Sequence, residues 1–269
     1  MKNTKITLAH GSGGKLTHEL VQRLFLPNFN NDALSILGDS AILNINGTKL
    51  AFTTDSYVVK PLFFPGGDIG RLAVSGTIND LAVVGAEPMF LSAGFIIEEG
   101  FEMSLLERIV GSMRETTALT GVDIVTGDTK VVESGSADGL YINTCGIGIV
   151  NESVNLSTSL IEIGDKIIVS GTLGDHGMAV LSERESLGFI PSIKSDCAPL
   201  SGMIKKILAS GARIKFMRDP TRGGLATTLN EFVNTQKYGI LIEEQAIPIN
   251  DGVRALCEIL GYDPLYIAN

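Results

Sequence analysis

The sequence of 269 residues contains no tryptophan, only three cysteines, and no apolar stretch as long as a membrane-spanning helix requires. The cysteines, Cys145, Cys197 and Cys257, are far apart and form no CxxC pair, which excludes a disulfide framework and a cysteine zinc site. Residues 1–9 lack the apolar core of a signal peptide. We therefore expect a cytoplasmic protein that does not associate with membranes.

Basic residues are also scarce. The chain has 21 Lys and Arg against 30 Asp and Glu, a formal net charge of −9 and a sequence pI of about 4.9. Binding to nucleic acid depends on clustered cations that release counterions from phosphates, so this charge balance argues against a nucleic-acid partner. Hydrophobic residues, at 44%, provide for a sizeable core and argue against disorder.

Apolar periodicity predicts an α+β fold with two lobes. In the first half we expect strands at 41–45, 50–54, 89–97 and 140–149, and helices at 16–24, 68–84 and 104–120. The apolar run at 89–97 is typical of a strand buried on both faces. In the second half we expect strands at 166–170 and 239–243, and helices at 198–210, 224–233, 253–260 and from Met178 onward.

A polar, Ser/Thr/Asn-rich stretch at 151–159 indicates the boundary between the lobes. We divide the chain into a glycine-rich loop with a helix (1–33), a first lobe (34–155) and a second α+β lobe (156–269). The composition of residues 263–269 is typical of a strand or turn and not of a polar terminal tail. We therefore expect the second lobe to be truncated.

Standard phosphate-binding motifs are missing, because neither a Walker A sequence nor a Rossmann glycine fingerprint occurs. The chain does have a glycine-dense loop, Gly11-Ser12-Gly13-Gly14-Lys15. Its N–H groups and lysine can surround a polyphosphate, although a flexible linker explains the same composition equally well.

Single aspartates stand in apolar or small-residue surroundings at several places. Aspartate is disfavoured in strands and costly to bury without a partner, so each of these residues needs one. Mg²⁺ prefers carboxylate, phosphate and water oxygens and can neutralise several carboxylates together, which predicts a nucleotide–Mg²⁺ site. The candidates are Asp39, Asp55, Asp80 and Asp128. The alternative for each is a helix or turn cap, and Asp80 is the strongest because its helical neighbours are nearly all apolar or small.

A second group of polar residues precedes the helix predicted at 224–233. Two arginines, Arg218 and Arg222, and the free N–H groups of a helix start can bind an anion, and Asp219 can add a metal ligand. A helix start with solvated arginines is the alternative. The histidines, His10, His18 and His176, have no zinc-site spacing.

Read in order, seven short motifs resemble those of one family. They are His10–Gly14, Gly38–Ala41, Thr53–Ser56, Asn79–Ala82, Thr126–Lys130, Gly174–Gly177 and Arg218–Gly224. The ordered set is similar to that of the HypE carbamoyl dehydratases, hydrogenase maturation proteins of the aminoimidazole-ribonucleotide-synthetase-like (PurM-like) superfamily. The resemblance spans the whole chain and is far more specific than any one motif.

This resemblance implies a two-lobe PurM-like fold in which the first lobe binds ATP and the first lobes of two subunits pair into a β-barrel. It implies that the oxygen of a carboxamide on a C-terminal cysteine is phosphorylated and phosphate then eliminated. The product is a thiocyanate that supplies cyanide ligands to [NiFe]-hydrogenase. The implied partners are a second copy, the carbamoyltransferase HypF and the HypC–HypD scaffold complex.

The resemblance also assigns roles by motif position. The implied Mg²⁺ ligands are Asp39, Asp80, Asp128 and Asp219. The implied ATP-binding residues are Gly11, Ser12, Gly13, Gly14, Asp55, Asn79, Thr129 and Arg222. Lys130, together with Asp80, is the catalytic candidate, because Lys130 would face the γ-phosphate or the amide and handle a proton. The alternative for Lys130 is a surface lysine after a turn.

One departure and two related families qualify this reading. The chain has no terminal cysteine, and none of its three cysteines replaces it, so we expect nucleotide binding without self-dehydration. Selenophosphate synthetases carry a reactive cysteine or selenocysteine where this chain has Ser12, and thiamine-monophosphate kinases carry acidic doublets where it has the single Asp39. From a different class, the chain is alternatively a docking module for maturation partners, with nucleotide as a structural ligand.

Overall fold

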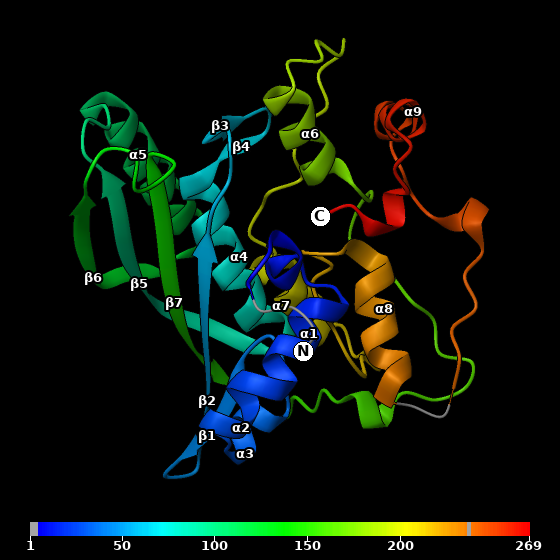
Figure 1. Cartoon of the computed structure of the whole chain (residues 1–269). Helices are drawn as coiled ribbons and strands as arrows, with labels where there is room; N and C mark the ends of the chain where they lie inside the picture. The colour runs from blue at the N-terminus through cyan, green and yellow to red at the C-terminus, as the bar shows by residue number, and fades with distance from the viewer. Residues whose placement is uncertain (1–4, 236–237) are drawn as a thin grey trace.

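The computed structural model describes residues 5–235 and 238–269 (Figure 1). Its first half contains a five-stranded sheet in the order β1-β2-β7-β5-β6. The strands are β1 (Ala41–Ile45), β2 (Thr48–Tyr57), β5 (Ala86–Glu98), β6 (Asp123–Val132) and β7 (Leu140–Val150). Helices α4 (Ile69–Val83) and α5 (Met103–Thr120) pack together, and a two-stranded hairpin of β3 (Phe63–Phe64) and β4 (Gly67–Asp68) precedes α4.

The sheet is antiparallel except at one edge. Neighbouring strands run antiparallel from β1 to β5, whereas β5 and β6 are parallel and are joined by the crossover helix α5. Asp55 of β2 lies opposite Thr144 of β7, which lies opposite Ala93 of β5. Residues that lie opposite each other on adjacent strands share a face of the sheet, so this register decides which polar side chains can meet.

One face of the sheet packs on α4 and the other is open. Side chains on the covered face join the fully buried α4 residues Ile69, Val74 and Ile78 in the main core. On the open face, Phe52, Ile147 and Phe90 lie in one row across β2, β7 and β5 and are 42–44% exposed. The prediction that β5 is buried on both faces is therefore wrong for the described chain, because no element covers this side.

Short helices precede the sheet. They are a 3₁₀ turn (Leu8–Gly11), α1 (Lys15–Leu20), a π-helical segment (Val21–Phe25), α2 (Leu26–Phe29) and α3 (Asp32–Ser35). The helix predicted at 16–24 is thus divided between α1 and the π segment. In Figure 1 this region is drawn between the sheet and the second half of the chain.

The second half is helical in the described residues. It contains α6 (Asp175–Arg184), α7 (Ser201–Ala209), α8 (Gly224–Thr235) and α9 (Asp251–Leu260), with 3₁₀ turns at Thr158–Leu160, Glu244–Ala246 and Pro264–Tyr266. The predicted strands at 166–170 and 239–243 are wrong. Ile168 and Leu241 are 86% and 91% exposed, and no strand among the described residues supplies the hydrogen-bond ladder that a strand needs.

A segment before α7, which we call the strap (residues 195–200), ties the two halves together. Ser195 N donates to Pro65 O at 2.8 Å, and Arg71 Nε donates to Cys197 O at 2.9 Å. Asn79 of α4 binds the strap twice, since its Nδ2 donates to Ala198 O at 3.0 Å and its Oδ1 accepts from Leu200 N at 2.7 Å. The strap therefore fixes the second half against α4.

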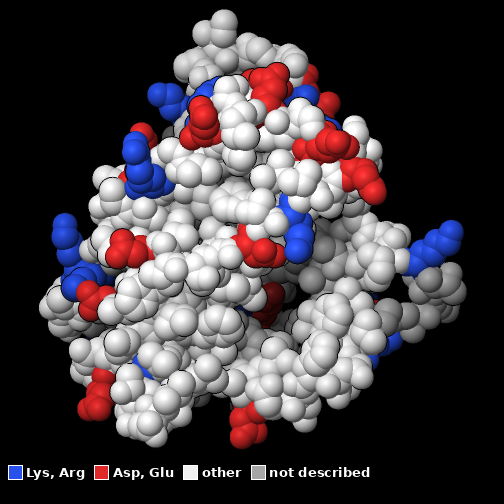
Figure 2. All heavy atoms as spheres, turned by 90° about the vertical axis from the view of Figure 1, so that its left-hand side faces the viewer, with Lys and Arg blue, Asp and Glu red and all other residues white. Residues whose placement is uncertain are grey.

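On the face shown in Figure 2, Lys and Arg side chains are scattered among acidic and uncharged ones. Within the described ranges, no helix is both long and apolar enough to span a membrane.

Candidate active site between the two halves of the chain

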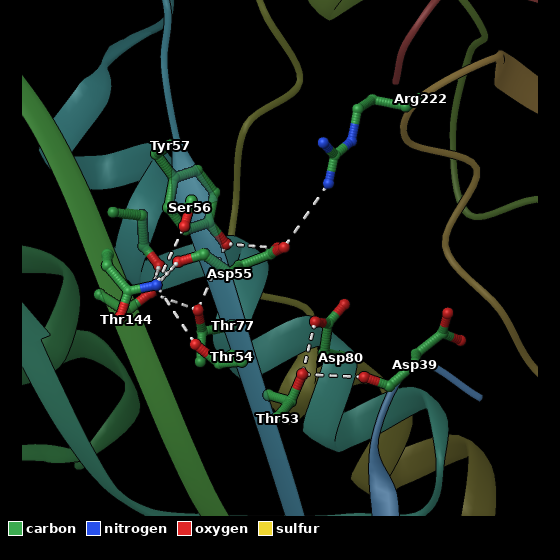
Figure 3. A network of polar contacts seen from close by, with 12 residues as sticks. Asp39, Thr53, Thr54, Asp55, Ser56, Tyr57, Thr77, Asp80, Thr144 and Arg222 are labelled. Atoms are coloured by element: carbon green, nitrogen blue, oxygen red, sulfur yellow. Dashed lines mark hydrogen bonds and ion pairs between the residues drawn. The ribbon is translucent and has the colours of Figure 1, made fainter. Parts of the chain in front are cut away.

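Four carboxyl groups from distant parts of the sequence influence one another electrostatically, and we call them the acidic cluster. They are Asp39 before β1, Asp55 on β2, Asp80 on α4 and Asp219 in the segment before α8. Figure 3 shows the side chains of Asp39, Asp55 and Asp80 on the same side of β2, with Arg222 facing Asp55. The sequence predicted all of these residues as ligands of one site.

The alternation of β2 and the hydroxyl of Thr53 position the cluster. Thr53 and Asp55 are two residues apart, so both side chains face α4. The Thr53 hydroxyl lies 2.8 Å from Asp39 O and 3.0 Å from Asp80 Oδ2, and Ser40 Oγ donates to Asp80 O at 3.0 Å. These contacts join the segment before β1, strand β2 and helix α4, which are far apart in the sequence. Thr53 is the first residue of the motif Thr53–Ser56, but the sequence assigned it no role of its own.

Burial dominates the protonation of the cluster. Asp80 is 9% exposed, and desolvation, followed by the charges of Asp219 and Asp55, raises its pKa to about 9. Desolvation and the charge of Asp219 raise the pKa of Asp39 to about 7, although Arg218 opposes the shift. Burial also raises the pKa values of Asp55 and Asp219. With a pKa of about 9, the Asp80 carboxyl retains its proton at neutral pH until a cation approaches.

Two arginines from the segment before α8 face the cluster. Arg218 Nε lies 3.1 Å from Asp39 Oδ1, and its Nη2 lies 3.1 Å from Glu231 Oε2 on α8. Arg222 Nη2 lies 3.8 Å from Asp55 Oδ1, and its side chain is 64% exposed. Glu231 escaped the sequence analysis, because an acidic residue on a helix carries no distinguishing motif. Arg222 remains free to approach an anion.

The glycine-dense loop reaches this site through Gly13. Its φ of 81° suits glycine, and a Cβ added there would lie 2.7 Å from the carbonyl oxygen of Arg222. The loop's backbone thus packs directly on the arginine segment. Ser12 Oγ donates to Ala9 O at 3.1 Å, whereas an added Cβ at Gly11 would meet nothing within 4 Å and at Gly14 only Ser12 Oγ. The structure brings the predicted loop to the predicted arginine.

Asn79, to which the resemblance assigns a role in ATP binding, contacts the second half of the chain. Both polar atoms of its side chain bind the backbone of the strap. Its contribution in this structure is to join α4 to the second half, next to Asp80.

The motif that contains Asp128, Thr129 and Lys130 lies apart from the acidic cluster. Asp128 on the edge strand β6 is opposite Gly94, which is opposite Asn143, so Asp128 belongs to the open face of the sheet. Lys130 lies two residues further along the same strand and is exposed on the same face. A hollow of about 520 Å³ adjoins this edge and includes Asp128 and Thr129 in its lining.

The acidic cluster offers carboxylate oxygens, which Mg²⁺ prefers as ligands, but its side chains alone do not surround a metal ion. Within the described ranges, no three His, Cys, Asp or Glu side chains stand close enough to hold a metal ion. Asp80 nevertheless has no ion pair among the described residues, and burial penalises its charged form. Buried carboxylates that repel one another offer the oxygen ligands that a hard divalent ion takes together with phosphate oxygens.

Comparison with known proteins identifies the family of both halves of the chain. Residues 37–150 match the family described as AIR synthase related protein, N-terminal domain, and residues 162–269 match AIR synthase related protein, C-terminal domain. The chain is thus a two-domain, PurM-like protein of mixed α and β structure, without a closed barrel among the described strands.

The relatives are more specific. The chain is 50% identical over 268 residues to the carbamoyl dehydratase HypE of Rhizobium leguminosarum bv. viciae, covering 99% of this chain and 77% of the relative. A crystal structure of a HypE–HypF complex matches with a TM-score of 0.88 and 50% identity over 93% of this chain and 81% of that one. A HypE crystal structure in complex with ATP matches with a TM-score of 0.80 and 48% identity, covering 98% and 79%. The chain belongs to the HypE carbamoyl dehydratase family of hydrogenase maturation proteins.

Proposed function

We propose that the chain performs the ATP-dependent step of cyanide-ligand synthesis, in which a cysteine S-carboxamide is dehydrated to a thiocyanate. The observation that carries the proposal is a buried acidic cluster facing two arginines and a glycine-dense loop. An amide oxygen is a poor leaving group, and phosphorylation makes it a good one. Phosphoryl transfer depends on positioning and charge neutralisation, which such a site supplies.

In this proposal Asp39, Asp80 and Asp219 hold Mg²⁺, and Asp55 and Arg222 contact ATP. Bound Mg²⁺ would neutralise charge on the phosphate oxygens. Arg222 approaches the phosphates from the second half of the chain, and the glycine-dense loop packs on the backbone of Arg222 through Gly13. The related HypE structure that contains ATP supports nucleotide binding at this fold.

The test supplies the carboxamide separately. A short peptide ending in S-carbamoyl-cysteine is incubated with the protein, Mg²⁺ and ATP, and mass spectrometry and a phosphate assay follow the peptide. We expect loss of one water from the peptide with one phosphate released per thiocyanate. Chelation of Mg²⁺ should stop both. Binding of maturation partners without ATP affinity would instead favour the docking function.

The partners of this reaction are also proposed. The related HypE–HypF crystal structure supports HypF as the carbamoyl donor that binds this chain. The HypC–HypD scaffold, a cytoplasmic location and the roles of Asp128, Thr129 and Lys130 rest on the resemblance. In a dimer formed through the open face, Asp128 and Lys130 would lie at the interface of the β-barrel that the resemblance implies.

The open face allows a direct test of the proposed dimer. Phe90 and Ile147 are cross-strand neighbours whose apolar side chains are 44% and 43% exposed, and an exposed apolar row marks an interaction surface. Replacing either by lysine should change the mass in light scattering from dimer to monomer. Ile163, which is 85% exposed outside the sheet, provides the control, since its lysine variant should remain dimeric. Equal masses for all variants would contradict this interface.

A further inference from the structure

A chain of buried hydroxyl groups lies behind Asp55. Tyr57 Oη donates to Asp55 Oδ2 at 3.0 Å and lies 3.3 Å from Thr77 Oγ1. The Thr77 hydroxyl binds that of Thr144, which donates to Ala73 O at 3.1 Å. Tyr57 is 8% exposed and both threonines are 0% exposed. Figure 3 shows this chain between β2 and α4, leading to the Asp55 carboxylate.

The count of protons fixes the direction of the Tyr57 hydrogen bond. With Asp55 ionised, three hydroxyl groups provide three protons for four contacts. The Thr144 hydroxyl donates its proton to the Ala73 carbonyl. The Thr77 hydroxyl therefore donates to Thr144 Oγ1. The proton of Tyr57 then goes to Asp55, and the contact left without a proton, Tyr57 to Thr77, is the longest at 3.3 Å.

Packing fixes the position of the Tyr57 hydroxyl. A Cβ added at Gly76 would lie 2.3 Å from Tyr57 Oη, so α4 closes around the ring and only glycine leaves space for it. The phenol therefore donates from a position fixed by the helix that carries Asp80. A rigid donor holds a carboxylate in one orientation better than a solvent-exposed one does.

The two oxygens of Asp55 face different partners. Oδ2 accepts from Tyr57, while Oδ1 lies 3.8 Å from Arg222 Nη2. We propose that Tyr57 is a positioning residue, which turns Oδ1 of Asp55 toward Arg222 and toward the polyphosphate and cation that occupy this space in the reaction. The inference rests on the proposed function, because it assigns Tyr57 a part in the same site.

The experiment measures the affinity for Mg²⁺–ATP by calorimetry and the phosphate release of the peptide assay. Tyr57→Phe keeps the ring and removes the donor, and we expect binding about tenfold weaker and turnover at least tenfold slower. Thr77→Val removes a hydroxyl from the same chain but leaves Tyr57 free to donate to Asp55. Its ATP affinity should stay within about twofold of wild type, even where its melting temperature falls.

A double-mutant cycle separates positioning from a general loss of packing. If Tyr57 acts through Asp55, Tyr57→Phe has no further effect on affinity in an Asp55→Ala background, where the acceptor of its hydrogen bond is missing. Tyr141→Phe, whose hydroxyl accepts from Asp138 N elsewhere on the sheet, is the matched tyrosine control and should bind as wild type does. Additive effects of the two substitutions, or equal losses in Tyr57→Phe and Thr77→Val, would overturn the inference. If the wild-type protein bound no ATP, the proposed function itself would fail.

Discussion

Replacing Asp80 by asparagine should lower ATP-dependent turnover by about 10²–10³-fold and leave the fold intact. Asp80 lies in the acidic cluster, is nearly inaccessible to solvent and has no ion pair among the described residues, so its charge is available to a bound cation. Asparagine has the same shape and still accepts the hydrogen bond from Thr53 Oγ1. Phosphate release in the peptide assay measures the effect, and circular dichroism verifies the fold.

A surface substitution provides the control for Asp80→Asn. Asp165 pairs with Lys215 at 2.8 Å on the surface of the second half, and Asp165→Asn should turn over at the wild-type rate. Undiminished turnover of Asp80→Asn would refute a metal-binding role for this aspartate. A loss of similar size in both variants would indicate a general effect on the fold.

Stability of the nucleotide-free protein should decrease as pH rises. Burial raises the pKa of Asp39 to about 7 and that of Asp80 to about 9, whereas both titrate near 4 in the unfolded chain. Between these values the folded state binds more protons than the unfolded state, so the free energy of unfolding falls with increasing pH. We expect the melting temperature to be highest near pH 4 and to fall by several degrees by about pH 8.

Variants and ligand identify the source of this pH dependence. Asp80→Asn carries no ionisable group there, so its melting temperature should exceed that of wild type by roughly 3–8 °C near pH 8 and differ little near pH 4.5. Mg²⁺–ATP should stabilise the wild-type protein most at high pH, because the ionised cluster binds the cation. A wild-type stability that rises from pH 5 to pH 8, or an unchanged profile in Asp80→Asn, would contradict the raised pKa values. Scanning fluorimetry over a pH series is the measurement.

The sequence predicted those parts of the site that depend on local pattern. A strand, a helix or a turn can be recognised from local sequence pattern, and such patterns contain Asp55, Asp80 and the two arginines before α8. The structure brings these residues together. The placement of Asp128 could not be predicted, since a shift of one residue in strand register moves a side chain to the opposite face. Periodicity gives the strand but not the partner opposite each residue.

Non-local pairing also limited the fold prediction. The alternation at 166–170 and 239–243 has the composition of strands, yet a strand forms only where another one offers its backbone groups. Glu231 and Tyr57 were missed for a related reason, because each matters only through a partner that is distant in sequence or hidden behind another residue. The helices α4 and α5, whose apolar spacing is local, were predicted to within a few residues.

The double contact of Asn79 with the strap has a consequence for protein engineering. Asn79 and Asp80 are consecutive, so the link between the two halves and the most buried acid of the site share one turn of α4. A chimera that exchanges the second half for that of another superfamily member must transfer the complementary sequence at 195–200 together with Pro65, Arg71 and Asn79. If only the charged residues of the site were grafted, the two halves would lack this link, and the charged groups of one half would not lie at the correct distance from those of the other.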